Sequence, residues 1–459
     1  MSDPAPTPTQ PGKLLSVLGV AFGLAGSVGG TIGAGILRTP GLVAAQLATP
    51  SLVLLAWLIG GLYALLGAVC LAELAASLPR AGGWYVYAEQ AFGRRAGWLV
   101  GWTDWLAHCI GLAWVATTVG ELLTEWLPAG PNPAVMAPVI ALAVLAGFGG
   151  IQVLGVKAGG TSQELLSLVK AVAFLGLAAA SFLLPPTLPV EPATTTAAPL
   201  AQGPALLIGA VLALQAVITT FDGWASPVYF AEEFSEPSRD LPRSLLGGVV
   251  AVLGLYLLIN AALLHVLPMQ TLSSSTLPAA DAARSLLGIR GGQLITAVAL
   301  VSLLGLINTV VMAAPRILFG LSRDGLMPGW LAGVNRGGTP VPALLITVAS
   351  AATLVLLGSF EHLLGMGAFL YVGLPLGGIA AQLWLRRHQP ELTRPFLCWG
   401  YPFTPLVVGA VSLMFLAGAL ISDTADSLLA LALAAAGGIA GELFGRCKQP
   451  VTPRNEQSP

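Results

Sequence analysis

The feature that most constrains this chain is a series of long apolar runs that recurs along its whole length. A helix of about 20 apolar residues crosses the roughly 30 Å hydrocarbon core of a bilayer, and about twelve runs approach or exceed that length. They cover residues 14–48, 50–78, 96–127, 134–156, 161–185, 204–234, 243–268, 290–322, 340–359, 362–386, 402–421 and 426–445. With 56% hydrophobic and 9% charged residues, the composition is typical of membrane proteins. The sequence therefore predicts an all-α polytopic membrane protein with about twelve transmembrane helices.

The basic residues predict how these helices are oriented. If both termini are cytoplasmic, 16 of the 20 Lys and Arg residues lie on the cytoplasmic side and only Arg284 and Arg290 lie outside. The polar, Pro-rich first twelve residues lack a basic n-region and a cleavage site, so we expect a retained tail rather than a signal peptide. The expected location is the inner (plasma) membrane of the cell.

One stretch of the first span does not have the pattern of a continuous helix. In SVGGTIGAGILRTPG, residues 27–41, Gly29, Gly30, Gly33 and Gly35 lack a Cβ and Pro40 has no N–H, so both residue types disfavour a regular helix. Unpaired backbone groups at membrane depth are tolerated only where protein buries them or where they line a polar cavity. The stretch is therefore a candidate binding site. For Gly29 and Gly30 alone, close helix packing through small residues is the favoured interpretation.

A second interrupted span lies at an equivalent position in the other half of the chain. In ALQAVITTFDGWASPVYFAEEF, residues 213–234, the apolar run is broken by Asp222, Gly223 and Pro227. The breaks fall in the first and sixth spans, so the two would enter the membrane in opposite orientations. This arrangement is typical of inverted-repeat transporters, whose site lies at the midplane between paired broken helices. Exposed amide groups there suit a carboxylate, and exposed carbonyls suit an ammonium group.

Motifs in a shared order link the chain to a known family. They are GTIGAGILRTPG in the first span, AELAASLPRAGGWYVYAEQAFG in and after the second, FDGWASPVYFAEEFSEPSRDLPR in and after the sixth, LGLINTVVMAAPRILFGLSRDGLMP in the eighth, GTPVPAL at the ninth and RPFLCWGYPFTP at the eleventh. In these motifs the chain resembles the amino acid-polyamine-organocation (APC) superfamily of secondary transporters. Within that superfamily it is similar to the bacterial relatives of the L-type amino acid transporters (LAT).

The resemblance implies a LeuT-type fold with five-plus-five inverted repeats, two further C-terminal helices and an alternating-access mechanism. The division that follows is a cytosolic tail over 1–13, a first repeat over 14–185, an exterior loop over 186–203, a second repeat over 204–386, two helices over 387–446 and a cytosolic tail over 447–459. The exterior loop is rich in Pro and Thr, a composition that cannot build a core of its own.

The resemblance also implies where a substrate binds. Its carboxylate would lie against the backbone amides near Gly33, Ala34 and Gly35. Its ammonium group would lie against carbonyls around Thr31 and Phe221. The other residues implied at the site are Ile32, Ile36, Asp222, Gly223 and Trp224. Phe221 resembles the gating aromatic residue that closes over bound substrate in the family, and the alternative for its ring is an ordinary position facing core or lipid.

Lys170 lies inside the fifth span, where a charged side chain costs about 3 kcal/mol on insertion scales. Similar family members place a lysine where sodium-coupled relatives bind a cation, with its ammonium group on carbonyls of the first-helix break. The resemblance thus implies a sodium-independent site in which Lys170 supports the break and could couple transport to protons. The alternative is a side chain that extends to the cytosolic interface.

Four further charged residues are candidates for the site or its gates. Asp222 could pair with a cationic substrate, organise unwound backbone or carry a proton. Arg38 departs from the family pattern, since many relatives have a small or apolar residue there. It either belongs to an exterior gate, paired with an acidic residue, or extends to the interface. Arg323 and Asp324 resemble a cytosolic motif that acts in the inner gate through ion pairs.

Other kinds of site find little support in the sequence. The four histidines are scattered, and the spacing of the four cysteines suits neither a disulfide framework nor a zinc site, so we expect no metal and no cofactor. The chain has neither a Walker A loop nor an HExxH motif, which argues against an enzyme, and it shows no repeated filter segments of a channel. We expect no nucleic-acid partner. The loop PAGPNP has no cysteine, so we expect no disulfide-linked heavy chain of the kind that joins related animal proteins.

The function predicted from these features is secondary active transport of amino acids, by a permease or exchanger, with neutral L-amino acids as substrates. The expected partners are therefore a small amino acid and the lipid bilayer. Two alternatives stay open: a transporter of polyamines or cationic amino acids, and a nontransporting amino-acid sensor that keeps the same site.

Overall fold

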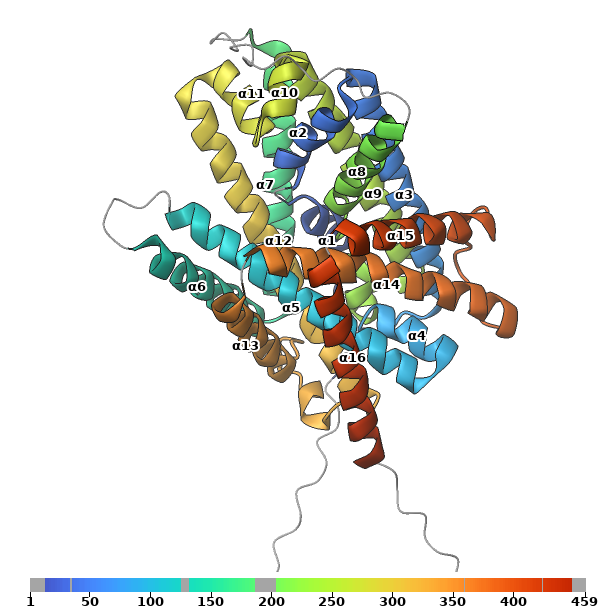
Figure 1. Cartoon of the computed structure of the whole chain (residues 1–459). Helices are drawn as coiled ribbons and strands as arrows, with labels where there is room; N and C mark the ends of the chain where they lie inside the picture. Colours follow the sequence, from blue (N-terminus) through green and yellow to red (C-terminus); the bar gives the residue numbers. More distant parts are fainter. Residues whose placement is uncertain are drawn as a thin grey trace, which may run out of the picture.

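The computed structural model describes residues 13–33, 35–124, 132–185, 204–358, 360–422 and 424–447. Within these ranges the chain forms sixteen α-helices and two 3-10 helices, and a single bridge between Leu18 and Phe234 is its only β-structure. Figure 1 shows the helices gathered in one bundle. The predicted exterior loop over 186–203, the tail over 1–12 and most of the C-terminal tail lie outside the described residues.

The long helices alternate with short connecting ones. The first half of the chain contains α3 (Pro50–Ser77), α4 (Trp84–Phe92), α5 (Arg94–Thr124), α6 (Pro133–Val153) and α7 (Val156–Leu183). The second half contains α9 (Pro237–Val266), α10 (Met269–Ser274), α11 (Pro278–Leu287), α12 (Ile289–Arg323), η2 (Gly329–Ala332), α13 (Val341–Leu357) and α14 (Phe360–His388). The chain continues into α15 (Phe403–Ser422) and α16 (Thr424–Cys447).

Two segments are interrupted where the glycine patterns predict a break. In the first, α1 (Val20–Thr31) and α2 (Gly35–Leu47) meet at an angle of 49°. In the second, α8 (Pro204–Thr220) ends in a turn that leads into the 3-10 helix η1 (Ser226–Glu233). Gly223 in this turn has a φ of 98°, a backbone conformation that favours glycine.

The first break is narrower than the sequence pattern predicts. Gly29 and Gly30 belong to α1, and Pro40 lies inside α2, so the interruption lies between Thr31, where α1 ends, and Gly35, where α2 begins. Because Pro40 has no N–H, α2 loses one backbone hydrogen bond, but the helix continues on both sides of it. Pro40 was therefore wrongly included in the predicted break.

The number of apolar helices agrees with the twelve spans expected from the sequence. Among the described residues, eight helices are long and apolar enough to cross a membrane, and the bent pair of α1 and α2 adds a ninth. Three shorter apolar helices, α8, α13 and α16, account for the rest. Large apolar side chains are widely exposed, for example Val172, Leu345 and Leu413 at about 60%. This surface suits lipid, and the all-α polytopic fold is confirmed.

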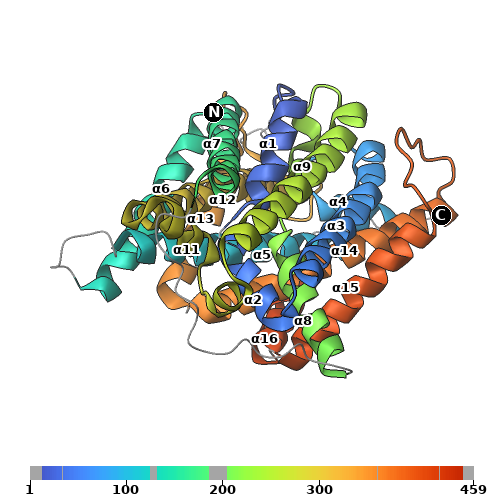
Figure 2. The same ribbon diagram turned by 90° about the horizontal axis from the view of Figure 1, so that it is seen from above.

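The long helices hold both broken segments in the middle of the bundle. α1 packs against α7, α9 and α12, while α2 packs against α8 and α3 packs against α9. Figure 2 shows α1 and α9 side by side in the view from above. The bridge adds two backbone hydrogen bonds of 2.9 Å, from Leu18 N–H to the Glu233 carbonyl and from Ser235 N–H to the Leu18 carbonyl. The start of α1 is thereby fixed to the end of η1.

Candidate functional site

The two broken segments cross at a pair of glycines. A Cβ on Gly223 would lie 2.3 Å from the carbonyl oxygen of Gly30, and a Cβ on Gly30 would lie 2.8 Å from the carbonyl oxygen of Gly223. Backbone atoms cannot yield as a flexible side chain can, so the crossing requires glycine on both sides. Gly29 is also closely packed, since its Cβ would lie 1.9 Å from Nε2 of Gln163, although that neighbour is a side chain. The close packing expected for Gly29 and Gly30 is present.

A single tyrosine hydroxyl joins the ends of the two broken helices. Tyr256 on α9 is fully buried, and its hydroxyl lies 3.0 Å from the carbonyl oxygen of Thr31 and 3.2 Å from that of Thr220. These are the last residues of α1 and α8, whose terminal carbonyls lack partners within their helices. The sequence analysis did not identify Tyr256, because a tyrosine in an apolar span carries no signal of its distant partner.

Lys170 on α7 donates hydrogen bonds to the backbone at the first break. Its side chain has 0% exposure, and Nζ lies 2.9 Å from the carbonyl oxygen of Gly29 and 3.0 Å from that of Ile32. A Cβ on Gly305 of α12 would lie 2.6 Å from Cε of Lys170, so α12 packs directly against the lysine side chain. The side chain does not extend to an interface, and the ammonium group serves as a donor to unwound backbone.

The amide groups of the first break are partly used by the break itself. The Ile32 N–H donates to the Val28 carbonyl and the Gly33 N–H donates to the Thr31 carbonyl, both at 2.9 Å. Ala34 lies outside the described residues. Gly35 begins α2, and the first N–H groups of a helix have no partner within it. The donors open to an anion in this conformation therefore belong to the start of α2, which includes Gly35 of the expected site, whereas the Gly33 N–H is occupied by the Thr31 carbonyl.

The start of α2 and the end of α8 lie against one another. A Cβ on Gly35 would come within 3.1 Å of Cγ2 of Thr220. The hydroxyls of Thr39 and Thr220 lie 2.8 Å apart and share a hydrogen bond. A positive helix end and a negative helix end thus meet close to the crossing, which is the arrangement that suits a zwitterion.

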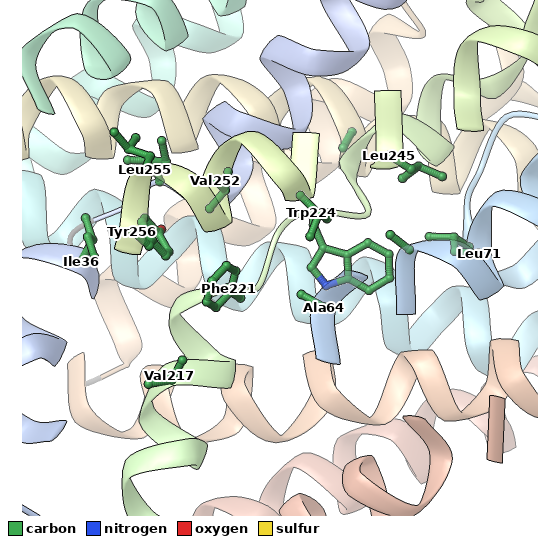
Figure 3. Close-up of a cluster of buried hydrophobic side chains, with 14 of the residues drawn as sticks. Ile36, Ala64, Leu71, Val217, Phe221, Trp224, Leu245, Val252, Leu255 and Tyr256 are labelled. Atoms are coloured by element: carbon green, nitrogen blue, oxygen red, sulfur yellow. The ribbon is translucent and has the colours of Figure 1, made fainter. Parts of the chain in front are cut away.

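Phe221 and its neighbours form the apolar side of the crossing, which Figure 3 shows from close by. The Phe221 ring is 2% exposed and lies 6.1 Å from the Trp57 ring and 5.0 Å from the Tyr256 ring, measured between centroids. Ile32 and Ile36 are also fully buried. Phe221 therefore occupies a core position here, which is the alternative to the gating role implied by the family.

A small cavity of about 50 Å³ opens on the other side of the second break. Asp222, Gly223 and Trp224 contribute to its wall, together with His108 on α5 and Tyr371 on α14. The remaining lining residues are Trp84, Ala225, Ser226, Tyr229, Leu374 and Pro375.

A buried polar cluster forms one wall of this cavity. Nδ1 of His108 lies 3.1 Å from Oδ1 of Asp104, and the Tyr229 hydroxyl donates to the same oxygen at 2.9 Å. The His108 ring also contacts the rings of Tyr229 and Tyr371, with centroids 4.8 and 5.6 Å apart. The four-residue spacing of Asp104 and His108 on one helix could have revealed the first contact, but not the tyrosines. No metal-binding group is found among the described residues.

A network of ion pairs surrounds the end of α12. Arg323 pairs with Glu232 on η1, and Asp324 accepts hydrogen bonds from Arg80 and from the Tyr85 hydroxyl, the latter at 3.0 Å. Burial, with the Asp324 carboxylate nearby, holds the pKa of Tyr85 well above its usual range. Arg323 and Asp324 thus join α12 to η1 and α4 through charges, as the implied gate motif requires.

A second ion pair, fully buried, lies next to this network. Arg316 on α12 forms a bidentate ion pair with Glu233, in which Nη2 lies 2.8 Å from Oε2. The Arg316 guanidinium also lies 4.5 Å from the centre of the Phe230 ring. Arg38, in contrast, is exposed, and no acidic residue in the described part of the chain pairs with it. The acidic partner expected for an exterior gate is therefore not found there.

Two broken helices that cross at glycines above a buried lysine, inside a bundle of about twelve apolar helices, define a membrane transporter built on paired broken helices. Comparison with known proteins identifies the family. A family model described as amino acid permease matches residues 13–436. The chain therefore belongs to the amino acid permease family, and the prediction of an APC-superfamily amino acid transporter rather than an enzyme is confirmed.

Similar proteins match over most of their length. The serine/threonine exchanger SteT of Bacillus subtilis (strain 168) is 27% identical over 438 residues, covering 94% of this chain and 97% of its own. The Asc-type amino acid transporter 1 of Mus musculus is 30% identical over 384 residues, covering 80% and 70%. The b(0,+)-type amino acid transporter 1 of Mus musculus is 26% identical over 424 residues, covering 90% and 84%.

Proposed function

We propose that this chain is an amino acid exchanger of the cell membrane that works by alternating access and binds its substrate where the broken helices cross. The observation that carries the proposal is the contact of Gly30 with Gly223, which brings free helix ends from both halves of the chain together. One similar protein is a serine/threonine exchanger and two others are amino acid transporters. An exchange mechanism agrees with the first of these.

The proposed substrate is a neutral L-amino acid. Its carboxylate binds at the start of α2, near Gly35, and its ammonium group binds the carbonyls at the end of α8, near Phe221. Its side chain points to the cavity beside Asp222, whose volume of about 50 Å³ and polar wall suit a small side chain. Polyamines would need more than one acidic partner, and among the described residues Asp222 is the only carboxylate that lines the cavity, since Asp104 lies behind His108 and Tyr229.

Lys170 replaces a coupling cation in this proposal. Its ammonium group already occupies the carbonyls of Gly29 and Ile32, so the break needs no sodium ion to balance its dipoles. Release of the lysine proton during the cycle would free both carbonyls and loosen the break. Proton coupling through Lys170 is therefore part of the proposal.

The repeats are proposed to run over residues 14–185 and 204–386, which contain α1 to α7 and α8 to α14. Both termini are proposed to be cytosolic, in agreement with the distribution of basic residues. On that orientation the ion pairs around Asp324 close the inner side of the bundle. Most of the loop PAGPNP lies outside the described residues, and its lack of cysteine supports a transporter without a disulfide-linked heavy chain.

The experiment that tests the proposed function is uptake of labelled serine into proteoliposomes loaded with unlabelled serine. A panel of the common amino acids and a few polyamines, each added outside at two pH values, then defines the substrate and the coupling. We expect uptake that depends on internal substrate and is inhibited by neutral amino acids. Inhibition by polyamines alone would contradict the substrate class, and saturable binding without uptake would favour a sensor.

A further inference from the structure

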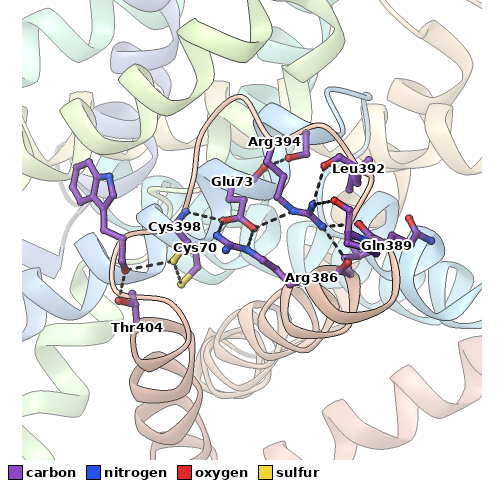
Figure 4. A network of polar contacts seen from close by, with 12 residues as sticks. Cys70, Glu73, Arg386, Gln389, Leu392, Arg394, Cys398 and Thr404 are labelled. Carbon is purple, nitrogen blue, oxygen red and sulfur yellow. Dashed lines mark hydrogen bonds and ion pairs between the residues drawn. The ribbon is translucent and has the colours of Figure 1, made fainter.

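Two thiols from opposite ends of the sequence lie in contact away from the substrate crossing. Sγ of Cys70 lies 3.7 Å from Sγ of Cys398, and the two residues are 3% and 5% exposed. Cys70 lies near the end of α3, and Cys398 lies in the segment that joins α14 to α15. Figure 4 shows both sulfur atoms facing one another across this junction.

A network of charged groups holds the segment with Cys398 against α3. The Cys398 N–H donates a hydrogen bond to Oε2 of Glu73 at 2.7 Å. Oε1 of Glu73 accepts a second hydrogen bond, from Nε of Arg386 at 2.8 Å. Arg394 of the same segment lies 3.7 Å from Oε1 of Glu73. Since Glu73 follows Cys70 by three residues, both side chains lie on one face of α3. The same carboxylate therefore positions the segment and brings its thiol to Cys70.

We propose that Cys70 and Cys398 are a modification site, at which an oxidant such as hydrogen peroxide forms a reversible disulfide between α3 and the α14–α15 segment. The bond needs the sulfur atoms to approach from 3.7 Å to about 2.0 Å.

The reaction balances with one equivalent of peroxide. The Cys398 thiolate attacks one peroxide oxygen, the O–O bond breaks, and the leaving hydroxide takes a proton to become water. The Cys70 sulfur then attacks the Cys398 sulfenic acid, so that the S–S bond forms, the S–O bond breaks and a second water leaves with the Cys70 proton. Two thiols lose two electrons in total, and peroxide gains them.

Cys398 is the better nucleophile of the two. The hydrogen bond from the Cys70 thiol lowers the pKa of Cys398, and the nearby Arg386 guanidinium acts in the same direction. Cys109 on α5 is also buried, at 1% exposed, but makes no such sulfur contact within the described ranges. Cys109 is therefore a matched internal control for a buried thiol without a partner.

The bond would join two parts of the bundle that have different neighbours. α3 packs mainly against α9, which carries Tyr256 at the substrate crossing, whereas α14 packs mainly against α4 and α5 and makes a smaller contact with α3. A covalent link between α3 and the segment after α14 restrains any movement of these groups past one another. If the chain works by alternating access, as proposed above, the oxidised form cycles more slowly.

The bond itself is tested on the full-length protein in liposomes, independently of transport. Protein treated with hydrogen peroxide is denatured, alkylated, digested and analysed by mass spectrometry. We expect a peptide pair linked through Cys70 and Cys398, lost after dithiothreitol, while Cys109 stays alkylated. In Cys70→Ser, Cys398 should accumulate as sulfenic acid that dimedone traps. Full alkylation of both cysteines after peroxide, or links from either to another cysteine instead, would overturn the proposal.

Uptake measurements test separately whether the disulfide slows transport. Wild-type uptake should fall after peroxide and recover after dithiothreitol, while Cys70→Ser and Cys398→Ser, each compared with its own untreated sample, should keep their uptake. A linked peptide with unchanged uptake contradicts the restraint on movement. A wild type without uptake before oxidation contradicts the proposed function, and the peptide result then decides the bond alone.

Discussion

At the scale of single residues, Lys170 determines how the first break is stabilised. Its described partners are two backbone carbonyls, of Gly29 and Ile32, rather than a carboxylate. A buried carbonyl left without a donor costs about 1–3 kcal/mol. The charge is therefore tied to the conformation of the break, because the carbonyls reach the ammonium group only while the helix is interrupted at this place.

Lys170→Ala should reduce amino acid uptake by about tenfold or more, since a loss of about 1.4 kcal/mol already corresponds to a factor of ten. The initial rate of uptake into proteoliposomes measures this. Lys157→Ala is the matched control, because Lys157 is exposed near the start of the same helix. Uptake by Lys170→Ala at the wild-type rate would show that the lysine has no role in transport.

Glu89 on α4 predicts a pH dependence of stability. Burial, followed by the neighbouring Asp324 carboxylate, raises the pKa of Glu89 above its usual value of 4.5. The folded protein thus holds this proton more tightly than the unfolded chain does. The resulting stabilisation is complete below about pH 4.5 and is lost as the pH rises through the raised pKa.

Glu89→Gln cannot titrate, so its Tm should fall less than that of the wild type as the pH rises over this interval. Thermal unfolding of the purified protein in detergent, measured at a series of pH values, tests the difference. Glu164→Gln, at an exposed position on α7, is the control. If the curves for Glu89→Gln and wild type run parallel, the pKa of Glu89 is not raised in the folded protein.

At the scale of elements, the account depends on the crossing of α1 with the turn after α8. Gly223→Ala places a Cβ 2.3 Å from the Gly30 carbonyl oxygen and also strains a φ of 98°. Backbone strain of this kind alone costs about 1–3 kcal/mol. We expect loss of substrate binding and a lower Tm, whereas Gly254→Ala, with open space around its Cβ, should match the wild type. Equal binding by both variants would mean that the helices cross elsewhere.

Tyr256→Phe is a smaller change that tests the hydrogen bonds between the tyrosine hydroxyl and the two helix ends. The change removes one hydroxyl and leaves the ring, so it should cost about 1 kcal/mol and lower the affinity for substrate several-fold. Tyr401→Phe is the matched control, since Tyr401 lies in the segment after α14 with its ring against Arg386. Competition binding with labelled substrate compares the two variants. Similar affinities would exclude a role of Tyr256 in shaping the site.

Local chemistry decided which elements could be predicted from the sequence. The breaks were predicted because Gly and Pro disfavour helix wherever they stand, and Lys170 stood out because charge is rare inside an apolar span. Pro40 shows the limit of such rules, since α2 tolerates it. Tyr256, Tyr229 and Tyr371 were missed because their partners lie on other helices, and only packing reveals them.

At the scale of the whole molecule, η1 connects the network around Asp324 with the proposed site at the crossing. η1 carries Glu232 and Glu233 at its end and follows directly from the turn that contains Gly223. These two acids pair with Arg323 and Arg316 of α12. A movement of η1 must therefore break ion pairs and reshape the crossing together. This connection is what an alternating-access transporter requires between its gate and its site.

The most direct test of this account is counterflow of labelled serine into proteoliposomes loaded with unlabelled serine, comparing the wild type with Gly223→Ala and Gly254→Ala. The account predicts saturable, internally stimulated uptake by the wild type and Gly254→Ala, and none by Gly223→Ala. Wild-type protein that binds amino acids without any uptake, or Gly223→Ala that takes up serine at the wild-type rate, would contradict it.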